Sequence, residues 1–131
     1  MTDGQIFSIL IVDDEQFVRH LLSSFLGSKY VCTTAENADQ ALAEMKSRHI
    51  DLVMTDIIMP GISGLELCDI VRHSYPQTRV LIVSALGDGP RREAARKSGA
   101  VDFLEKPFDL KQVLSAVDRA LEHRPAVTDL S

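Results

Sequence analysis

Two kinds of hydrophobic pattern alternate along the chain. In the first kind, apolar and β-branched residues follow one another without interruption, which is typical of strands that are buried on both faces. In the second kind, apolar residues recur every three or four positions, which is typical of helices that bury one face. The first pattern predicts strands over residues 7–12, 30–35, 52–55, 80–83 and 101–104. The second pattern predicts helices over residues 15–26, 37–48, 64–75, 91–98 and 109–122.

Residues that commonly begin or end helices flank the helical segments. Asn37 and Asp109 can accept hydrogen bonds from the first turns of the second and fifth helices. Pro90 suits the first turn of the fourth helix, and Gly27 can end the first one. These signals support the helix boundaries that the hydrophobic spacing predicts.

The regular alternation of strand and helix predicts an α/β fold. Crossovers between parallel strands are right-handed and place a helix on a face of the sheet, so we expect a doubly wound, five-stranded parallel sheet with five helices. The strand order 2-1-3-4-5 is common among such sheets, and we expect it here. A length of 131 residues fits one domain, which we expect over residues 5–124, followed by a tail or the start of a linker over residues 125–131.

The helix predicted over residues 91–98 differs from the others. Its arginines and lysine surround only two alanines, Ala94 and Ala95, so its apolar face is thin. A helix that buries little apolar surface should dock weakly. We therefore expect this helix to be a moving part.

Composition and charge exclude several classes of function. The net charge of −5 provides no broad basic field for a nucleic acid. The longest apolar run, over residues 6–12, is too short to span a bilayer, and the first residues lack the basic start of a signal peptide. Cys32 and Cys68 have no metal-ligand spacing, and we interpret them as buried packing residues. We expect a cytoplasmic protein that binds neither nucleic acid nor membrane.

Polar residues stand at the ends of four predicted strands. In the expected strand order, Asp13 and Asp14 at the end of the first strand lie beside Asp56 at the end of the third. Carboxylates at such short distances repel one another unless a cation is bound, and hard oxygen ligands suit Mg²⁺. Ser84 and Lys106, at the ends of the fourth and fifth strands, add a hydroxyl and an ammonium group. Phosphoryl transfer uses such a set of groups, which makes Asp56 the best candidate nucleophile.

Each of these residues also has an ordinary structural explanation. An aspartate after a strand often forms a turn or caps a helix, and a single serine or lysine there is uninformative. Their joint occurrence at one edge of the sheet favours a functional site.

Three alternative functions remain for such a site. A phosphatase with an aspartate nucleophile would resemble a DxD pattern after the first strand, which Glu15 breaks here. A flavin-binding module would need hydroxyl and glycine donors for a phosphate, which Asp13 and Asp14 would repel. The third alternative is an interaction module that acts without phosphorylation.

Four short motifs surround the candidate site residues. They are Ile11-Val12-Asp13-Asp14-Glu15, Asp56-Ile57-Ile58-Met59-Pro60 with Gly64, Val83-Ser84-Ala85, and Glu105-Lys106-Pro107-Phe108. Together they resemble the signature motifs of response-regulator receiver domains of two-component signalling. The likeness covers residues 6–123 and implies a flavodoxin-like, three-layer fold similar to that of chemotaxis regulators.

The resemblance implies a metal-dependent phosphoacceptor site. Asp56 would accept the phosphoryl group. Asp13 and Asp14 would be the acidic pair that holds Mg²⁺ together with Asp56 and the backbone carbonyl of Ile58. Mn²⁺ could substitute for Mg²⁺.

The same resemblance implies roles for residues at the ends of the fourth and fifth strands. Ser84 and Lys106 would bind the phosphoryl group, and the small side chain of Ala85 would leave access for the phosphodonor. The peptide bond between Lys106 and Pro107 would be cis, as X-Pro bonds permit. Phe103 matches an aromatic residue that turns inward on phosphorylation, although core packing is the simpler explanation for a buried aromatic residue.

Two apolar residues match positions that tune the lifetime of the phosphoryl group in the family. Ile58 and Leu86 would shield the acyl phosphate from water, because exclusion of water slows hydrolysis of a reactive intermediate. Phosphorylation would also draw the hydroxyl of Ser84 inward and pull residues 87–90 with it.

The implied phosphodonor is a sensor histidine kinase, a phosphotransfer protein or a small acyl phosphate. The implied target is an effector domain or protein that contacts the face formed by residues 91–98, 101–104 and 109–122. The last helix lacks the arginine-rich pattern of dimerising receivers, so we expect a monomer or a dimer that forms on phosphorylation. Beyond its own phosphorylation and dephosphorylation we expect no turnover of an external substrate, so the chain would not be an enzyme.

Overall fold

Strands and helices alternate along the chain as the hydrophobic pattern predicts. The computed structural model describes residues 6–85 and 87–122, so the ends of the predicted domain and the predicted tail at 125–131 lie outside the described residues. The strands are β1 (Ser8–Val12), β2 (Val31–Ala35), β3 (Leu52–Thr55), β4 (Arg79–Ser84) and β5 (Asp102–Glu105). The helices are α1 (Gln16–Leu26), α2 (Ala38–Ser47), α3 (Gly64–Ser74), α4 (Gly89–Lys97) and α5 (Leu110–Glu122).

The described strands form one parallel sheet in the order β2-β1-β3-β4-β5. This confirms the doubly wound topology predicted from the sequence. Val12, the last residue of β1, is in register with Thr55, the last residue of β3. The segments that follow these two strands therefore leave the sheet side by side at its carboxyl edge, where folds of this class place their sites.

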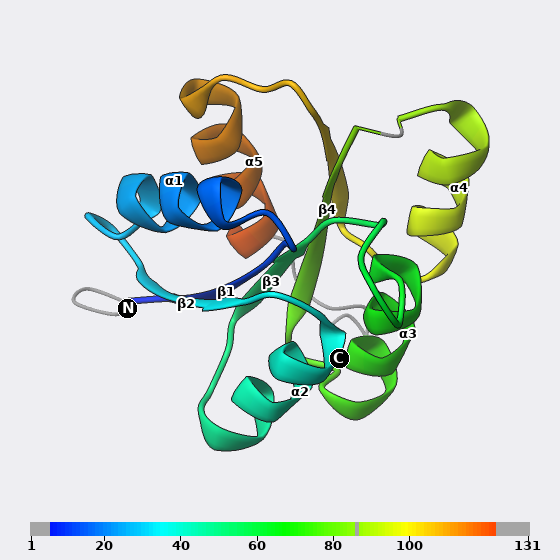
Figure 1. The fold of residues 1–131 in the computed structure, drawn as a ribbon, viewed down its shortest axis with the longest axis horizontal. Coiled ribbons are helices and arrows are strands. Elements are labelled where there is room, and N and C mark those ends of the chain that lie inside the picture. Colours follow the sequence, from blue (N-terminus) through cyan, green and yellow to red (C-terminus); the bar gives the residue numbers. More distant parts are fainter. Residues whose placement is uncertain (1–5, 86, 123–131) are drawn as a thin grey trace.

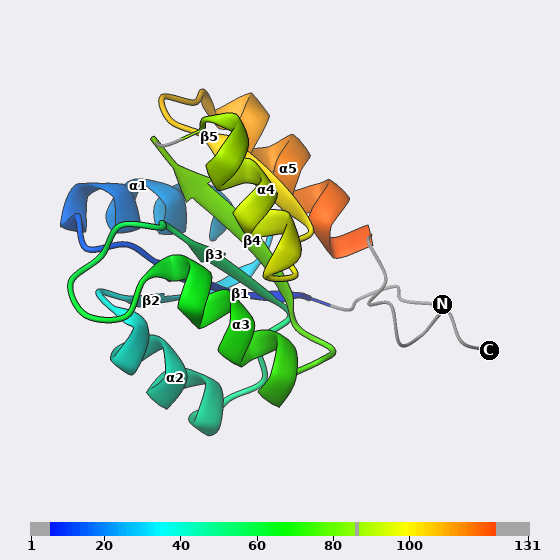
Figure 2. The ribbon, with the colours of Figure 1, turned by 90° about the vertical axis from the view of Figure 1, so that its right-hand side faces the viewer.

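Helices cover both faces of the sheet, which explains the continuous apolar runs in the strands. Figures 1 and 2 show α1 and α5 on one face, with α2 and α3 on the other. Alternate residues of β1 point to the two faces. Leu10 and Val12 belong to the core that includes α2, α3 and Ala95 of α4, while Ile9 and Ile11 belong to the core that includes α1 and α5. Burial of these two apolar cores is the main favourable contribution to folding.

Helix α1 buries a narrower stripe than its spacing predicts. Leu22 and Leu26 are almost fully buried, and Val18 and Phe25 pack beside them. Phe17 has the same three- and four-residue spacing as the apolar residues of this helix, yet 75% of its surface is exposed. Successive residues are about 100° apart around a helix, so Phe17 lies on the rim of the stripe that Val18 begins. Three- and four-residue spacing thus includes rim positions as well as buried ones.

Side-chain caps fix the starts of four helices, and Ser63 provides the one on α3. Asn37 and Asp109 cap α2 and α5 as predicted, each accepting a hydrogen bond of 2.8 Å from the backbone N–H three residues later. Helix α4 begins at Gly89, earlier than the predicted start at residue 91, because Asp88 caps it by accepting a hydrogen bond from the N–H of Arg91. Of the α4 residues, all of which the structure describes, Ala95 alone is fully buried. The predicted thin apolar face is therefore confirmed.

The two cysteines are free thiols in packing positions. Cys68 is fully buried, and Cys32 is partly buried. Burial raises the pKa of the Cys68 thiol to about 12, so this group stays protonated and unreactive near neutral pH. No helix within residues 6–85 and 87–122 is long and apolar enough to cross a membrane.

Candidate functional site

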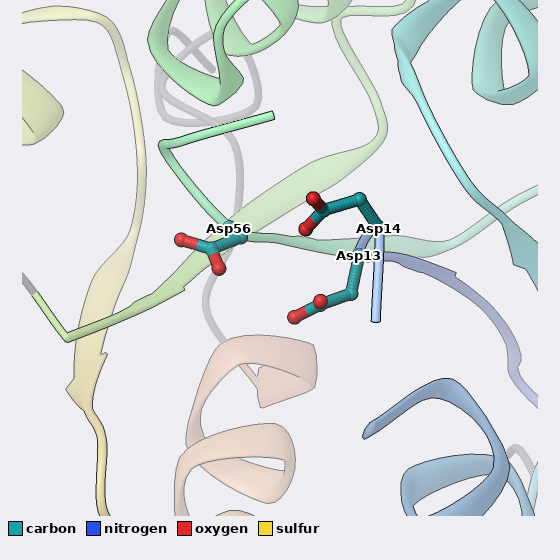
Figure 3. A group of neighbouring side chains, drawn as sticks. All are labelled: Asp13, Asp14 and Asp56. Carbon is teal, nitrogen blue, oxygen red and sulfur yellow. The ribbon is translucent and has the colours of Figure 1, made fainter. Parts of the chain in front are cut away.

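Three aspartates from two strand ends meet at the carboxyl edge of the sheet. Asp13 and Asp14 follow β1, and Asp56 follows β3. Each offers a carboxylate oxygen within 4.8 Å of the others, and Figure 3 shows the three side chains grouped at these strand ends. Asp13 is buried, Asp56 is partly buried and Asp14 is exposed. The strand order thus brings together the acidic residues that the sequence singled out.

Hydrogen bonds from the sheet hold Asp56 in place. Its N–H donates to the carbonyl of Val12 at 3.2 Å, which extends the pairing between β1 and β3. The fully buried hydroxyl of Thr55 donates to the Asp56 carbonyl at 2.9 Å. The N–H of Ile57 donates to Oδ1 of the Asp56 carboxylate at 2.7 Å. The other carboxylate oxygen, Oδ2, is directed to Lys106.

A second set of hydrogen bonds holds Asp13. Its N–H donates to the carbonyl of Ala35 at 3.1 Å, and its Oδ1 accepts from the N–H of Glu15 at 2.9 Å. Its carbonyl accepts a hydrogen bond of 2.8 Å from Nη1 of Arg19 on α1. The turn after β1 is therefore fixed on both sides, while the next residue, Asp14, keeps its carboxylate in solvent.

Lys106 supplies a positive charge between the aspartates. Its Nζ lies 3.0 Å from Oδ2 of Asp13 and 3.0 Å from Oδ2 of Asp56, with Oε1 of Glu15 at 3.8 Å. Burial alone would lower the pKa of Lys106, but hydrogen bonds to Asp56 and Asp13 outweigh it and raise the pKa above its usual value. The ammonium group is therefore charged at neutral pH. The peptide bond between Lys106 and Pro107 is cis, the geometry that the family resemblance implies.

The end of β4 lies directly beside the end of β5. Ser84 is 1% exposed and pairs in register with Glu105. Its carbonyl accepts a hydrogen bond of 2.9 Å from the N–H of Lys106. Ala85 is exposed and lines an open, mainly apolar hollow of about 390 Å³ next to Lys106. The access for a phosphodonor that we expect beside Ala85 stays a prediction.

Ile58 and Phe103, two of the remaining predicted residues, lie on segments next to this centre. Ile58 follows Asp56 by two positions, and its side chain is 60% exposed. Leu86 lies outside the described residues. Phe103 on β5 is partly buried against the core beneath α2 and α3, and its ring lies under the guanidinium group of Arg92. Phe103 thus lies at the margin of the core, where Arg92 of α4 packs over its ring.

The donor set fits a hard divalent cation. Carboxylate oxygens are ligands that Mg²⁺ prefers, and the exposed position of Asp14 leaves one side open for water ligands. Lys106 balances the charge of Asp13 and Asp56, so a cation at these oxygens would compete with the ammonium group. The site can therefore exchange the positive charge of Lys106 for that of a cation.

Comparison with known sequences identifies the family. Residues 9–118 match the family model of the response regulator receiver domain. The chain belongs to the response regulator receiver family. This assignment, which places the chain in two-component signalling, replaces the phosphatase and the flavin-binding alternatives.

Two curated relatives illustrate the similarity of this receiver domain to longer proteins. It is 36% identical over 116 residues to the DNA-binding transcriptional regulator NtrC of Salmonella typhimurium and 41% identical over 117 residues to the nitrogen assimilation regulatory protein NtrX of Azorhizobium caulinodans. The matches cover 88% and 87% of this chain but 25% and 26% of the relatives. The chain thus spans about a quarter of the length of these relatives.

Solved structures of receiver domains agree with the fold. The signal receiver domain of an HD domain-containing protein from Pseudomonas fluorescens Pf-5 superposes with a TM-score of 0.86 at 30% identity, covering 91% of this chain and 97% of that one. NtrX from Brucella abortus gives a TM-score of 0.84 at 36% identity, covering 90% of this chain and 27% of that one. The receiver fold is thus shared over nearly all of this chain.

Sequence reasoning missed residues that position the site without entering it. Thr55 could have been recognised as a polar residue at the end of an apolar strand, where only a buried partner would justify a hydroxyl. Arg19 and Arg92 gave no such signal, because the partners of a long side chain depend on which elements pack around it.

Proposed function

We propose that Asp56 accepts a phosphoryl group in a reaction that requires Mg²⁺. The observation that best supports this is the Asp56 carboxylate, grouped with the acidic pair and 3.0 Å from Nζ of Lys106. An oxygen of Asp56 would attack the phosphorus of a phosphohistidine or a small acyl phosphate. A new P–O bond would form while the bond to the donor breaks, and the donor would leave with the bonding electron pair. The product is an acyl phosphate on Asp56.

Asp13, Asp14, Asp56 and the carbonyl of Ile58 would hold the metal ion. When bound, Mg²⁺ or Mn²⁺ neutralises the negative charge of the phosphoryl oxygens. The hydrogen bond from the N–H of Glu15 keeps the buried Asp13 carboxylate oriented before any ion arrives. One ligand is therefore preorganised, and the exposed Asp14 can adjust.

Lys106 and Ser84 would bind the phosphoryl oxygens. The ammonium group of Lys106 already lies between the carboxylates of Asp13 and Asp56. It would exchange one of these partners for an oxygen of the incoming phosphoryl group. Ser84 would offer its hydroxyl from the end of β4. Ala85 has no side chain beyond Cβ, so it would leave the approach open to the donor.

The output would appear on the face formed by α4, β5 and α5. Movement of Ser84 toward the phosphoryl group would pull residues 87–90, and α4 would follow because it buries so little apolar surface. Phe103 has no hydroxyl, so its inward and outward positions would differ by packing alone. Ile58 and Leu86 stay predictions as residues that tune the phosphoryl lifetime.

The donor would be a sensor histidine kinase or a phosphotransfer protein, and the target an effector domain or protein. Relatives named as a DNA-binding transcriptional regulator and a nitrogen assimilation regulator support control of a regulatory output. The receiver itself would bind neither nucleic acid nor membrane and would turn over no external substrate. It would act in the cytoplasm as a monomer, or as a dimer that forms on phosphorylation.

Intact-mass spectrometry with acetyl phosphate tests the proposal. In the presence of Mg²⁺ the wild type should gain the mass of one phosphoryl group, whereas Asp56→Ala should gain none. Removal of Mg²⁺ with a chelator should abolish the gain in the wild type. Asp69→Ala, which removes an exposed carboxylate from α3, should be phosphorylated like the wild type. A wild type that gains no mass would favour an interaction module that acts without phosphorylation.

A further inference from the structure

Arg92 connects three parts of the proposed output face through one guanidinium group. Its Nε donates to the carbonyl of Gly87 at 2.9 Å, and its Nη2 donates to Oε1 of Glu105 at 3.0 Å. The guanidinium carbon lies 4.6 Å from the centre of the Phe103 ring, a cation–π distance. The segment before α4, helix α4 and strand β5 therefore meet at this side chain.

Among the residues that the structure describes, the neighbouring arginines of α4 form local ion pairs. Arg91 and Arg96 each pair with an acidic residue three positions away in the same segment. Such pairs on an exposed helix contribute little to the position of the helix. Arg92 instead contacts elements that lie on either side of α4 in the sequence, so its contacts depend on how these elements are placed.

Other contacts hold α4 near its C-terminal end. The thiol of Cys68 on α3 donates to the carbonyl of Ser98 at 3.3 Å, and Nη1 of Arg72 donates to the carbonyl of Lys97 at 3.4 Å. The N-terminal end of α4 follows β4 and lies toward the carboxyl edge of the sheet. Arg92 thus ties to β5 the end of the helix that is nearer to the proposed phosphorylation site.

Glu105 links Arg92 to that site. It precedes Lys106 and pairs in register with Ser84. Its carboxylate lies close against Gly87, since a Cβ placed on Gly87 would come within 2.4 Å of Cδ of Glu105. Gly87 follows Ser84 by three residues, so a shift of Ser84 toward a phosphoryl group changes the spacing between Gly87 and Glu105. Arg92 holds together these same two residues.

We infer that Arg92 is a positioning residue that stabilises the unphosphorylated arrangement of Gly87, α4 and β5. The inference rests on the proposed function and adds a regulatory element to it. Phosphorylation has to break or rearrange the contacts of Arg92 when Phe103 turns and Gly87 moves. Removal of Arg92 destabilises only the unphosphorylated arrangement, so it shifts the population toward the one that accepts the phosphoryl group.

Arg92→Met tests this inference, with Arg96→Met as the matched control. Both variants remove one exposed arginine from α4, but Arg96→Met leaves the contacts to β5 intact. In the assay Asp56 gains a P–O bond from acetyl phosphate and acetate leaves with the electron pair. We expect Arg92→Met to be phosphorylated roughly fivefold faster than the wild type, the size expected for loss of an exposed ion pair and a cation–π contact. Arg96→Met should be phosphorylated at the wild-type rate. Arg92→Lys lacks the planar guanidinium group, so its rate should lie between those of the wild type and Arg92→Met.

Hydrogen exchange of the unphosphorylated proteins provides a second readout. Amides of residues 89–97 should exchange faster in Arg92→Met than in the wild type or Arg96→Met, while those of α5 stay protected. Glu105→Gln should add little to the rate once Arg92 has been replaced, because both changes break the same contact. A phosphorylation rate that is unchanged or lower in Arg92→Met, or equally raised in Arg96→Met, would overturn the inference. If the wild type gains no phosphoryl group, the proposed function fails, and the exchange comparison alone decides whether Arg92 holds α4.

Discussion

Individual polar groups around Asp13 offset the free-energy cost of burying its carboxylate. Asp13 is 3% exposed, and an isolated carboxylate at such a position would be strongly destabilising. The ammonium group of Lys106 at 3.0 Å and the N–H of Glu15 at 2.9 Å provide its charge balance and a hydrogen bond. Loss of Lys106 would leave the buried Asp13 without its ion-pair partner, whereas loss of Asp13 would leave Lys106 paired with Asp56. The residues of this site therefore depend on one another for stability as well as for chemistry.

Tyr30 provides a titration that reports on the folded state away from the crevice. Burial raises its pKa above the usual value of about 10, and so do the hydrogen bond to Asp118 and the charges of Asp118 and Glu122. A raised pKa in the folded state adds stability that is present below pH 10 and is lost as the pH rises above it. In Tyr75→Phe, where Tyr30 is the one remaining tyrosine, phenolate absorbance should appear only well above pH 10. Adding Asp118→Asn should move this titration to lower pH, and an unchanged curve would show that Asp118 does not affect Tyr30.

Side chains at strand ends were predictable, whereas the contacts of the long side chain of Arg92 on α4 were not. Asp13 and Asp56 extend directly from the ends of adjacent strands, so the strand order alone places their carboxylates together. The position of Arg92 depends on Glu105 and Phe103, and these residues meet it only after α4 has docked on β5. The sequence pattern therefore predicts which residues stand at strand ends, but not the contacts that form only when a helix docks.

At the level of elements, the start of α3 restricts the backbone of Asp56, the proposed phosphoacceptor. A Cβ on Gly64, the first residue of α3, would lie 1.8 Å from the carbonyl oxygen of Asp56. Gly64→Ala should therefore lower the free energy of unfolding by about 2 kcal/mol and slow phosphorylation, because the helix or Asp56 must move. Gly89→Ala, in open space at the start of α4, should leave the stability within about 1 kcal/mol of the wild type. Urea denaturation measures the free energy of unfolding of both variants. Equal values for the two would show that α3 can shift without loss of stability.

The type and polarity of each element could be predicted from its own residues. Its exact first and last residues depend on neighbouring residues and elements. The thin apolar face of α4 was visible in the sequence and is reproduced by the burial of Ala95 alone among its residues. The start of α4 at Gly89 was missed because the cap, Asp88, precedes the first apolar position by several residues. Phe17 on α1 is exposed despite its spacing, because the neighbouring elements decide where the buried stripe of a helix ends.

At the level of the molecule, the topology could be predicted because the central strands β1, β3 and β4 are apolar on both sides. Such strands need helices on both faces, and right-handed crossovers then leave few possible arrangements. The strand order came from the frequency of one arrangement among similar sheets and not from the residues themselves. That order places Asp56 next to Asp13 and Asp14, so the prediction of the site depended on it.

Binding of Mg²⁺ should stabilise the whole domain, since the candidate ligands follow β1 and β3 and come together only in the folded chain. A ligand of the folded state alone adds about 1.4 kcal/mol at roughly ten times its dissociation constant, which should raise the melting temperature by a few degrees. Asp14→Asn removes one of three like charges, so it should melt above the wild type without metal and gain less from Mg²⁺. Asp69→Asn makes the same charge change on the exposed surface of α3 and should keep the full gain. An Asp14→Asn variant that also keeps the full gain would show that Asp14 is not a ligand.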